Sequence, residues 1–224
     1  MIIAIDGLAG SGKSSTAKLV AKKLGFNYFS TGKMYRALTN YMIKNNLLGG
    51  SIEKNIKEIN IMVKGENFNQ IIINGTDYSK NLYSDKVNKN ISSLSSIKSV
   101  RSKMVDIQRE VSTNNNIVCE GRDIGTIVFP DAKYKFYFKA DLKSRTDRRY
   151  LENKKNNIFI TKKELREMIK NRDYQDLNRK ESPLKKAKDA ILVITTSKTI
   201  EQQVSFICSI VNKWKLNIKE LYDN

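Results

Sequence analysis

Apolar residues at the start of the chain alternate between strand-like and helix-like spacing. A continuous apolar run at residues 2–5 is short enough for a buried strand and ends at Asp6-Gly7. Beyond a glycine-rich stretch, one apolar stripe recurs at the i, i+3, i+4, i+7 spacing of a helix face: Ala17, Val20, Ala21 and Leu24. Gly25 follows as a helix C-cap would. The first 25 residues therefore predict a strand, a loop and a helix.

The same two patterns continue to the end of the chain. Further apolar runs of strand length lie at residues 28–29, 117–119, 136–138 and 190–194. Helical stripes lie at residues 34–42 and 94–111, and a last one comprises Ile200, Val204, Ile207, Val211 and Trp214. Short strands separated by helices predict an α/β fold, a five-stranded parallel sheet covered by helices on both faces.

Residues 51–80 depart from this pattern. Ile59, Ile61 and Val63 alternate with other residues, and the apolar run 71–73 is followed by Asn74-Gly75, a hairpin turn signal. We expect short antiparallel strands here, as an insertion that caps a site and does not extend the parallel sheet.

Charged residues crowd the segment from Asp141 to Arg179. Residues 153–157 predict a loop, and Thr161 with Glu164 fits a capping box that begins a helix. The apolar stripe of that helix, at Leu165, Met168 and Ile169, is continued by three charged residues, Arg172, Asp176 and Arg179. These three form either an exposed Arg–Asp pair at a helix end or a cluster that grasps a phosphate and a sugar hydroxyl.

Composition narrows the chemistry. The 224-residue chain predicts one domain with insertions, and its formal charge of +18 invites a nucleic-acid interpretation. The excess is Lys scattered along the chain without a basic block interleaved with aromatics, so we favour small anionic substrates and expect no nucleic-acid partner. The absence of His excludes imidazole catalysis and His-ligated zinc. No stretch approaches the ~20 apolar residues of a membrane span, and we expect a cytosolic monomer with Cys119 and Cys208 as free thiols.

The glycine-rich stretch itself has the spacing of a phosphate-binding P-loop. Gly7-x-x-x-x-Gly12-Lys13-Ser14 directly follows the first strand. Its backbone N–H groups and the following helix N-terminus would cradle phosphates, because both present partial positive charge. Lys13 would reach the outer phosphates and the Ser14 hydroxyl would ligate Mg²⁺. An ordinary glycine-rich turn is the alternative.

Two other segments carry candidate chemistry. At Ser30-Thr31-Gly32 a turn offers hydroxyl groups before a helix that carries Arg36, although Thr31 could simply cap that helix and Arg36 could be surface charge. Glu120-Gly121-Arg122-Asp123 follows a core strand, where an open parallel sheet presents its ligand site.

Taken together, four segments resemble the bacterial cytidylate (CMP) kinases of the nucleoside-monophosphate kinase group. They are Ile5–Ser14, Ser30–Arg36, Gly121–Ala132, and Arg172–Arg179 with Ser182-Pro183-Leu184. The P-loop indicates only a nucleotide, whereas the Gly-Arg-Asp-Ile-Gly-Thr segment and the Arg/Asp/Asn-Arg segment are far more specific. The resemblance implies a P-loop kinase fold that transfers the γ-phosphoryl of ATP to CMP or dCMP with Mg²⁺, in pyrimidine nucleotide metabolism.

The resemblance also assigns residues. It implies an ATP site at Gly7, Leu8, Ala9, Gly10, Ser11, Gly12, Lys13, Ser14 and Ser15. It gives Arg36 and Arg122 to the CMP phosphate. Ser92, Arg101, Asp123 and Arg179 fall to the base, Arg172 and Asp176 to the ribose, and Thr31 to the acceptor site. Lys13, Arg122, Arg148 and Arg172 are the predicted catalytic residues, with Arg148 and Arg149 in a lid at about 145–172 and the monophosphate-binding insertion at about 36–96.

Some positions depart from the pattern of the family. Thr31 replaces Ser but keeps the hydroxyl, and Glu120 replaces Asp but keeps the carboxylate. Ser30 stands where Asp is usual and Gln175 where a basic residue is usual, so the ribose preference stays open. The remaining alternatives are a kinase acting on UMP, AMP or a non-nucleotide alcohol, and an ATP-dependent nucleic-acid-binding protein.

Overall fold

The structure, a computed structural model, describes residues 1–47 and 51–222. Its centre is a sheet of five parallel strands in the order β2-β6-β1-β7-β8. The strands are β1 (Ile2–Gly7), β2 (Asn27–Ser30), β6 (Ile117–Gly121), β7 (Tyr134–Lys139) and β8 (Ile191–Ile194). All five predicted strands are thus confirmed. Because β1 is central, Asp6 lies in register with Gly121 on one side and Tyr137 on the other.

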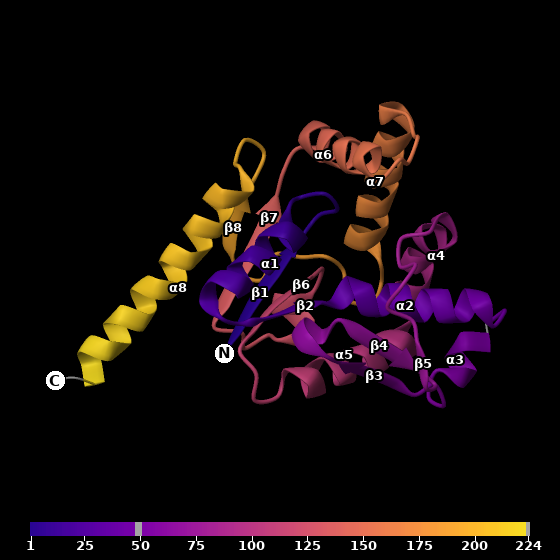
Figure 1. The fold of residues 1–224 in the computed structure, drawn as a ribbon, viewed down its shortest axis with the longest axis horizontal. Helices are drawn as coiled ribbons and strands as arrows, with labels where there is room; N and C mark the ends of the chain where they lie inside the picture. Colours follow the sequence, from indigo (N-terminus) through magenta and orange to yellow (C-terminus); the bar gives the residue numbers. More distant parts are fainter. Residues whose placement is uncertain (48–50, 223–224) are drawn as a thin grey trace.

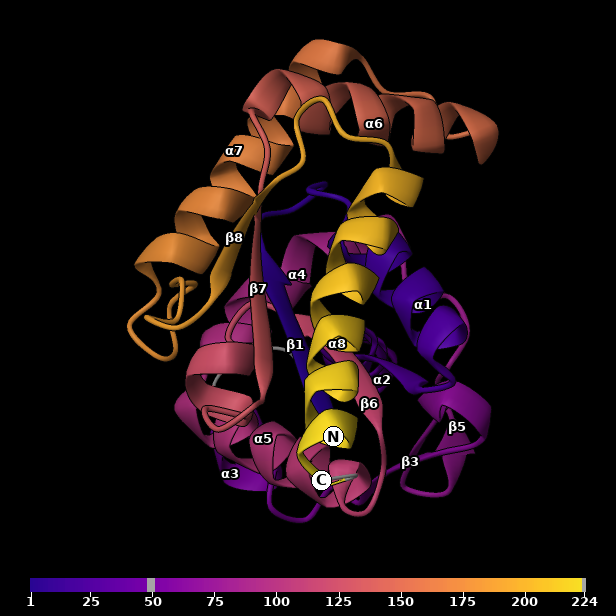
Figure 2. The same ribbon diagram turned by 90° about the vertical axis from the view of Figure 1, so that its left-hand side faces the viewer.

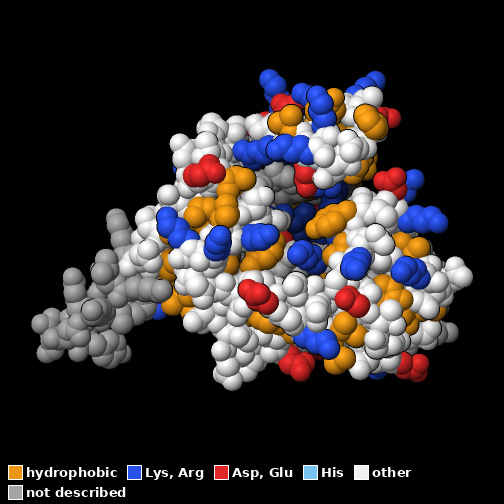
Figure 3. All heavy atoms as spheres, viewed as in Figure 1, with side chains coloured by type: hydrophobic (Ala, Val, Ile, Leu, Met, Phe, Trp, Pro, Cys, Tyr) orange, Lys and Arg blue, Asp and Glu red, His pale blue; other side chains and the backbone are white. Residues whose placement is uncertain are grey.

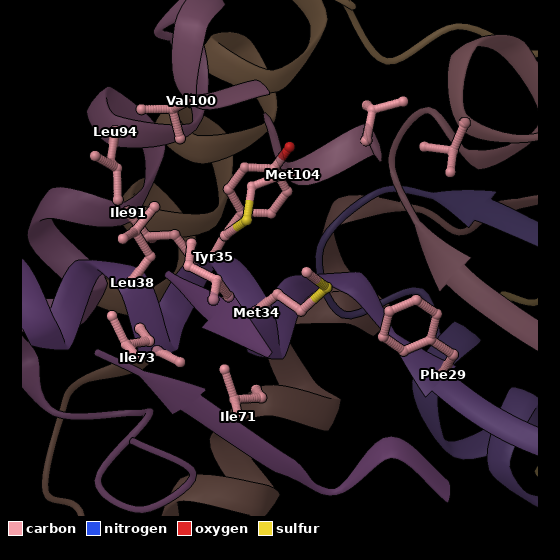
Figure 4. Packing of buried hydrophobic residues seen from close by; sticks show 14 of the residues in the cluster. Phe29, Met34, Tyr35, Leu38, Ile71, Ile73, Ile91, Leu94, Val100 and Met104 are labelled. Carbon is pink, nitrogen blue, oxygen red and sulfur yellow. The ribbon is translucent and has the colours of Figure 1, made fainter. Parts of the chain in front are cut away.

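Helices cover both faces of this sheet, as the apolar pattern predicted (Figures 1 and 2). On one face, α1 (Lys13–Leu24) and α8 (Ile200–Tyr222) pack on β1 through Val20 and Ile207. The other face packs against α2 (Thr31–Lys44) and α5 (Lys98–Ser112) through Met34, Leu38 and Met104 (Figure 4). Of the predicted stripe on α8, Trp214 lies outside the described side chains.

The insertion is the antiparallel unit that its alternation predicted. Strands β3 (Ile61–Lys64), β4 (Gln70–Ile73) and β5 (Thr76–Asp77) form a separate sheet, with the 3₁₀ turn η1 (Glu66–Phe68) between β3 and β4 and the short helix α3 (Ser51–Asn55) before them. Ile71 and Ile73 are buried against the core around α2 (Figure 4). The insertion is therefore built onto the helical layer and leaves the parallel sheet unchanged.

The helix predicted over residues 94–111 is instead two helices, so that prediction was wrong in its extent. Helix α4 (Asp85–Ser96) ends and α5 begins at Ile97, whose backbone is extended, with φ −74° and ψ 123°. Ser95 and Ser96 donate their hydroxyls to carbonyls three residues earlier, at 3.1 and 2.7 Å. Such local bonds compete with continuation of the helix. Because the apolar spacing continues across Ile97, the sequence pattern predicted one helix where the structure has two.

Helices α6 (Leu142–Lys155) and α7 (Lys162–Asn178) form a hairpin beside the P-loop end of the sheet (Figures 1 and 2). The capping box of Thr161 and Glu164 is confirmed. The predicted loop at 153–157 is wrong in its first half, because Asn153 is buried within α6 and its carbonyl accepts N–H bonds from Asn156 and Ile158, at 3.0 and 2.9 Å. Met168, placed on the buried stripe, is 50% exposed. In the described part of the chain, no helix combines the length and hydropathy needed to cross a bilayer.

Candidate functional site

The P-loop lies between the buried strand β1 and helix α1, at the centre of the sheet edge. Gly12 has φ +90°, a left-handed conformation that glycine adopts without strain, and a Cβ there would lie 3.1 Å from the Gln203 side-chain oxygen. The Lys13 ammonium turns back to donate to the Leu8 carbonyl at 3.3 Å, while Ser14 and Ser15 are exposed at the helix start. The loop therefore has the geometry of an anion cradle.

The segment that follows Arg122 and Asp123 is fixed to the same strand. The buried Asp6 carboxylate accepts the backbone N–H groups of Ile124 and Gly125, both at 2.8 Å. These residues open the π-helical turn η2 (Ile124–Val128) directly after the Gly-Arg-Asp sequence. Burial raises the pKa of Asp6 to about 7, although the two N–H bonds act in the opposite direction. Asp6 thus joins the end of β1 to the loop that carries Arg122 and Asp123.

Positive charges converge beside the P-loop. Burial, followed by the field of Arg122, lowers the pKa of Lys13 to about 7; Glu120 opposes this shift, and Arg172 adds to it by a smaller amount. Burial and the field of Arg122 likewise lower the pKa of Arg172 to about 10. Cations that destabilise one another in a partly buried site are stabilised when an anion binds among them. The cluster has the electrostatics of a phosphate site.

Arg36 belongs to this cluster. Its guanidinium is buried, donates through Nη1 to the Leu82 carbonyl at 2.9 Å and to Asn88 Oδ1 at 2.7 Å, and stacks 4.5 Å from the Tyr83 ring centroid. Burial and then the field of Arg172 lower its pKa to about 10. The surface-charge interpretation of Arg36 is therefore wrong.

The three charged residues on the α7 stripe meet the loop that carries Arg122 and Asp123. Asp176 accepts from Arg122 Nε at 2.7 Å and lies 3.9 Å from Arg172 Nε. Arg179, at the helix C-cap, lies 3.6 Å from the Asp123 carboxylate. Since Asp176 and Asp123 are both buried, this is a convergent cluster and not an exposed helix end.

A second polar group surrounds Asp123. Arg101 forms an ion pair with the Asp123 carboxylate and donates to the Ser95 carbonyl at 3.0 Å, and its guanidinium lies 5.6 Å from the Tyr35 ring centroid. Among the described residues, three buried atoms here have no hydrogen-bond partner: Tyr35 Oη, Arg101 Nε and Arg179 Nη2. Ser92 is half-buried one turn before Ser95, whose hydroxyl donates to its carbonyl. The group retains unused hydrogen-bonding capacity, as a polar ligand would require.

Two predicted residues have other contacts. The Thr31 hydroxyl donates to the Glu120 carbonyl at 3.1 Å, and the N-cap of α2 is Ser30, so Thr31 is not the cap. Arg148 donates to the Thr195 carbonyl and, at 3.2 Å, to the Thr196 carbonyl. Its contacts therefore lie with the segment after β8, not with Arg122 and Arg172.

The structure also identifies residues that the sequence did not single out. Arg145 and Asp173 form a buried ion pair that contacts the P-loop at Ala9. Asp173 directly follows Arg172, and a carboxylate placed between two motif residues was the available signal. The Glu120 carboxylate accepts a hydrogen bond from the Ser30 hydroxyl at 2.6 Å. Two of the residues that differ from the family pattern, Ser30 and Glu120, are therefore bonded to each other.

The space-filling view shows a hollow in the molecular surface that is lined by basic side chains. Figure 3 shows a hollow between the α6–α7 hairpin and the part that contains α2 and α4, with Lys and Arg side chains gathered in and around it.

A parallel sheet with a P-loop after its central strand and a cationic acceptor cluster opposite defines a P-loop kinase, a phosphotransferase of the nucleotide-kinase type. Comparison with known proteins then gives the family. The family model for cytidylate kinase matches residues 3–213, nearly the whole chain. The chain belongs to the cytidylate kinase family.

Individual relatives agree with this assignment. A cytidylate kinase of Fusobacterium nucleatum is 45% identical over 218 residues, which cover 96% of this chain and 99% of the relative. A cytidylate kinase of Clostridium botulinum is 44% identical over 211 residues, covering 94% of this chain and 97% of the relative. Among solved structures, an uncharacterized protein from Eubacterium ventriosum matches with a TM-score of 0.52 at 14% identity, covering 95% of this chain and 98% of that one. That last likeness concerns the fold alone.

Proposed function

We propose that this chain transfers the γ-phosphoryl group of ATP to the 5′-phosphate of CMP or dCMP, giving CDP or dCDP. The observation that carries the proposal is the cation cluster of Lys13, Arg36, Arg122 and Arg172, which extends from the P-loop to the Asp123 group. The end of the cluster at the P-loop suits the phosphates of ATP, and the end near Asp123 suits the phosphate of the acceptor. Membership of the cytidylate kinase family supports cytidine as the nucleoside of the acceptor.

The attacking group needs no base. A phosphate oxygen of CMP is already anionic at neutral pH, which suits a chain without His. Catalysis of phosphoryl transfer then reduces to in-line positioning and neutralisation of charge on the transferring group. Lys13 reaches from the donor loop, Arg36 and Arg122 hold the acceptor phosphate, and Arg172 helps to stabilise the transferring oxygens.

Base recognition falls to the polar group around Asp123. The amino group of cytosine donates to a carboxylate, as Asp and Glu do at this base in DNA grooves. Arg101 and Arg179 then donate to the ring nitrogen and carbonyl acceptors. Uracil presents a carbonyl where cytosine has its amino group, so the Asp123 carboxylate repels it. In this proposal Asp176 and Arg172 contact the ribose, and Ser92 belongs to the base-binding residues.

Residues in the P-loop fit Mg²⁺. Ser14 presents an exposed hydroxyl oxygen beside Lys13, and Mg²⁺ in kinases takes one or two protein oxygens and fills its shell with phosphates and water. When bound, the ion neutralises charge on the donor phosphates. Glu120, buried near Lys13 and fixed by Ser30, would orient a water of that shell.

The α6–α7 hairpin is the proposed lid, at about residues 145–172, with Arg148 carried on it. Closure would exclude water, which otherwise accepts the phosphoryl group and hydrolyses ATP. Residues 36–96 form the proposed monophosphate-binding insertion within a single domain. The monomeric state and the cytosolic location stay predictions.

A coupled ADP-release assay across CMP, dCMP, UMP and AMP tests the proposal. We expect CMP and dCMP to give kcat/KM at least tenfold above UMP and AMP, with Mg²⁺ required. Preference for UMP or AMP would overturn the assignment of the acceptor. ATP turnover stimulated by DNA or RNA, and not by CMP, would indicate a nucleic-acid-dependent ATPase instead.

A further inference from the structure

A buried ion pair from the proposed lid binds both backbone polar groups of one P-loop residue, Ala9. Asp173 Oδ1 accepts the Ala9 backbone N–H at 3.3 Å, and Arg145 Nη1 donates to the Ala9 carbonyl at 3.1 Å. Arg145 and Asp173 also pair with each other. Both N–H and C=O of a single loop residue are thus bonded to the α6–α7 hairpin, which lies more than 130 residues away in the sequence.

This contact is tightly packed. The side chains of Arg145 and Asp173 are 6% and 10% exposed, and Arg145 Nε additionally donates to the Ala140 carbonyl at 3.1 Å. A Cβ at Gly10, which has φ +71°, would lie 3.2 Å from the Arg145 carbonyl oxygen and 3.3 Å from its Cβ. The conformation of the loop backbone therefore depends on the position of Arg145 as well as on the loop's own glycines.

Asp173 also stands between residues of the acceptor side. It directly follows Arg172, and one turn later Asp176 accepts from Arg122 at 2.7 Å. One turn of α7 consequently touches the donor loop through Asp173 and the acceptor cluster through its neighbours.

We propose that Arg145 and Asp173 are positioning residues that set the donor phosphate loop against the acceptor cluster. They act through the backbone N–H and C=O of Ala9 and need touch no substrate. The inference rests on the donor half of the proposed function, because it requires a nucleotide phosphate at the P-loop but no particular acceptor.

Electrostatics and positioning predict opposite results for a substitution at Asp173. Its carboxylate is among the anions whose fields favour the charged forms of Arg122 and Arg172. If it acted only through charge, Asp173→Asn would make the site more positive and tighten binding of an anionic nucleotide. If it positions the loop, the same change weakens that binding. The double variant Arg145→Met/Asp173→Asn removes a pair without net charge, so its effect is positional, and it leaves no unpaired buried charge.

The test is calorimetric titration of the folded variants with ADP and Mg²⁺ in the absence of acceptor, and separately with CMP alone. We expect about a tenfold loss of ADP affinity in the double variant and in Asp173→Asn, with CMP affinity within twofold of the parent. A tenfold loss of affinity is an effect of the size expected when binding groups are misplaced. The acceptor assay of the proposed function can fail without altering the ADP result.

A matched control exists on the same two helices. Lys162 pairs with Asp147 at 2.6 Å across the hairpin, on the exposed side and away from the P-loop. Lys162→Gln/Asp147→Asn should leave ADP affinity unchanged. The inference is overturned if the folded double variant binds ADP within twofold of the parent. Should that variant not fold, ADP affinity equal to or tighter than the parent in Asp173→Asn overturns it as well.

Discussion

Replacing Lys13 with Met should abolish turnover and stabilise the protein at the same time. Lys13 is 5% exposed, and burial with the fields of Arg122 and Arg172 lowers its pKa from 10.5 to about 7. A cation whose pKa is lowered in the folded state opposes folding wherever the unfolded chain would carry the charge. Met keeps most of the apolar stem without that charge.

The size of the effect follows from the shift. At pH 7 the lowered pKa corresponds to about 4 kcal/mol against folding, since each pKa unit is worth ~1.4 kcal/mol. The variant loses the bond to the Leu8 carbonyl, worth about 1 kcal/mol. We therefore expect a net gain of about 1–3 kcal/mol, or about 2–4 °C in Tm per kcal/mol for a domain of this size.

The stability gain of Lys13→Met should depend on pH. The full gain holds below about pH 7, where the folded Lys13 is charged, and it declines as the pH rises from about 7 toward 10.5. Thermal unfolding at pH 6, 8 and 10 measures it, with Lys18→Met, an exposed lysine on the same helix, as the control. Turnover with ATP and CMP should fall by a factor of ~10³. A lower Tm, a gain that does not change with pH, or near-normal turnover would refute the reasoning.

Three further substitutions test other parts of the site. Asp123→Asn should lower the CMP-over-UMP ratio of kcat/KM by ~10–100-fold, because an amide can turn its N–H toward the uracil carbonyl, and an unchanged ratio would contradict the base assignment. Arg36→Lys should raise KM for CMP by about tenfold and leave KM for ATP unchanged, since Lys lacks the planar fork held by two bonds here; equal effects on both KM values would exclude an acceptor-phosphate role. Gly121→Ala should cost about 1–3 kcal/mol in denaturant unfolding, because its Cβ would lie 2.6 Å from the Thr31 hydroxyl, and a neutral result would mean that β2 and β6 can separate freely.

The parallel sheet could be predicted because each of its strands is an isolated apolar run. Strands buried on both faces need continuous hydrophobicity, and helices of 3.6-residue period separate them. The break at Ile97 could not be predicted in the same way. An apolar residue keeps its place in the stripe whether its backbone is helical or extended, and the serine hydroxyl bonds that favour the break are visible only in three dimensions.

The candidate site divides similarly. P-loop chemistry depends on local backbone geometry, so its spacing is legible in the sequence. Arg36 was ambiguous because a charged residue on a helix face gives no sign of burial, which here results partly from its contact with Asn88 of α4. Arg145 and Asp173 depend on a contact between distant segments, and the position of Asp173 between two motif residues was the one local signal.

The Asp6 carboxylate has a consequence for the geometry of the reaction. Strand β1 ends in the P-loop, and the side chain of its penultimate residue grips the two amides that begin η2. Asp6 thereby links the end of the strand that leads into the P-loop to the loop that follows Arg122 and Asp123, and it is anchored in the central strand of the sheet. If the α6–α7 hairpin closes as proposed, it would dehydrate the reactants without setting the distance between them. Sequence variation in the hairpin would then change speed and water exclusion and leave the Asp6 link unchanged.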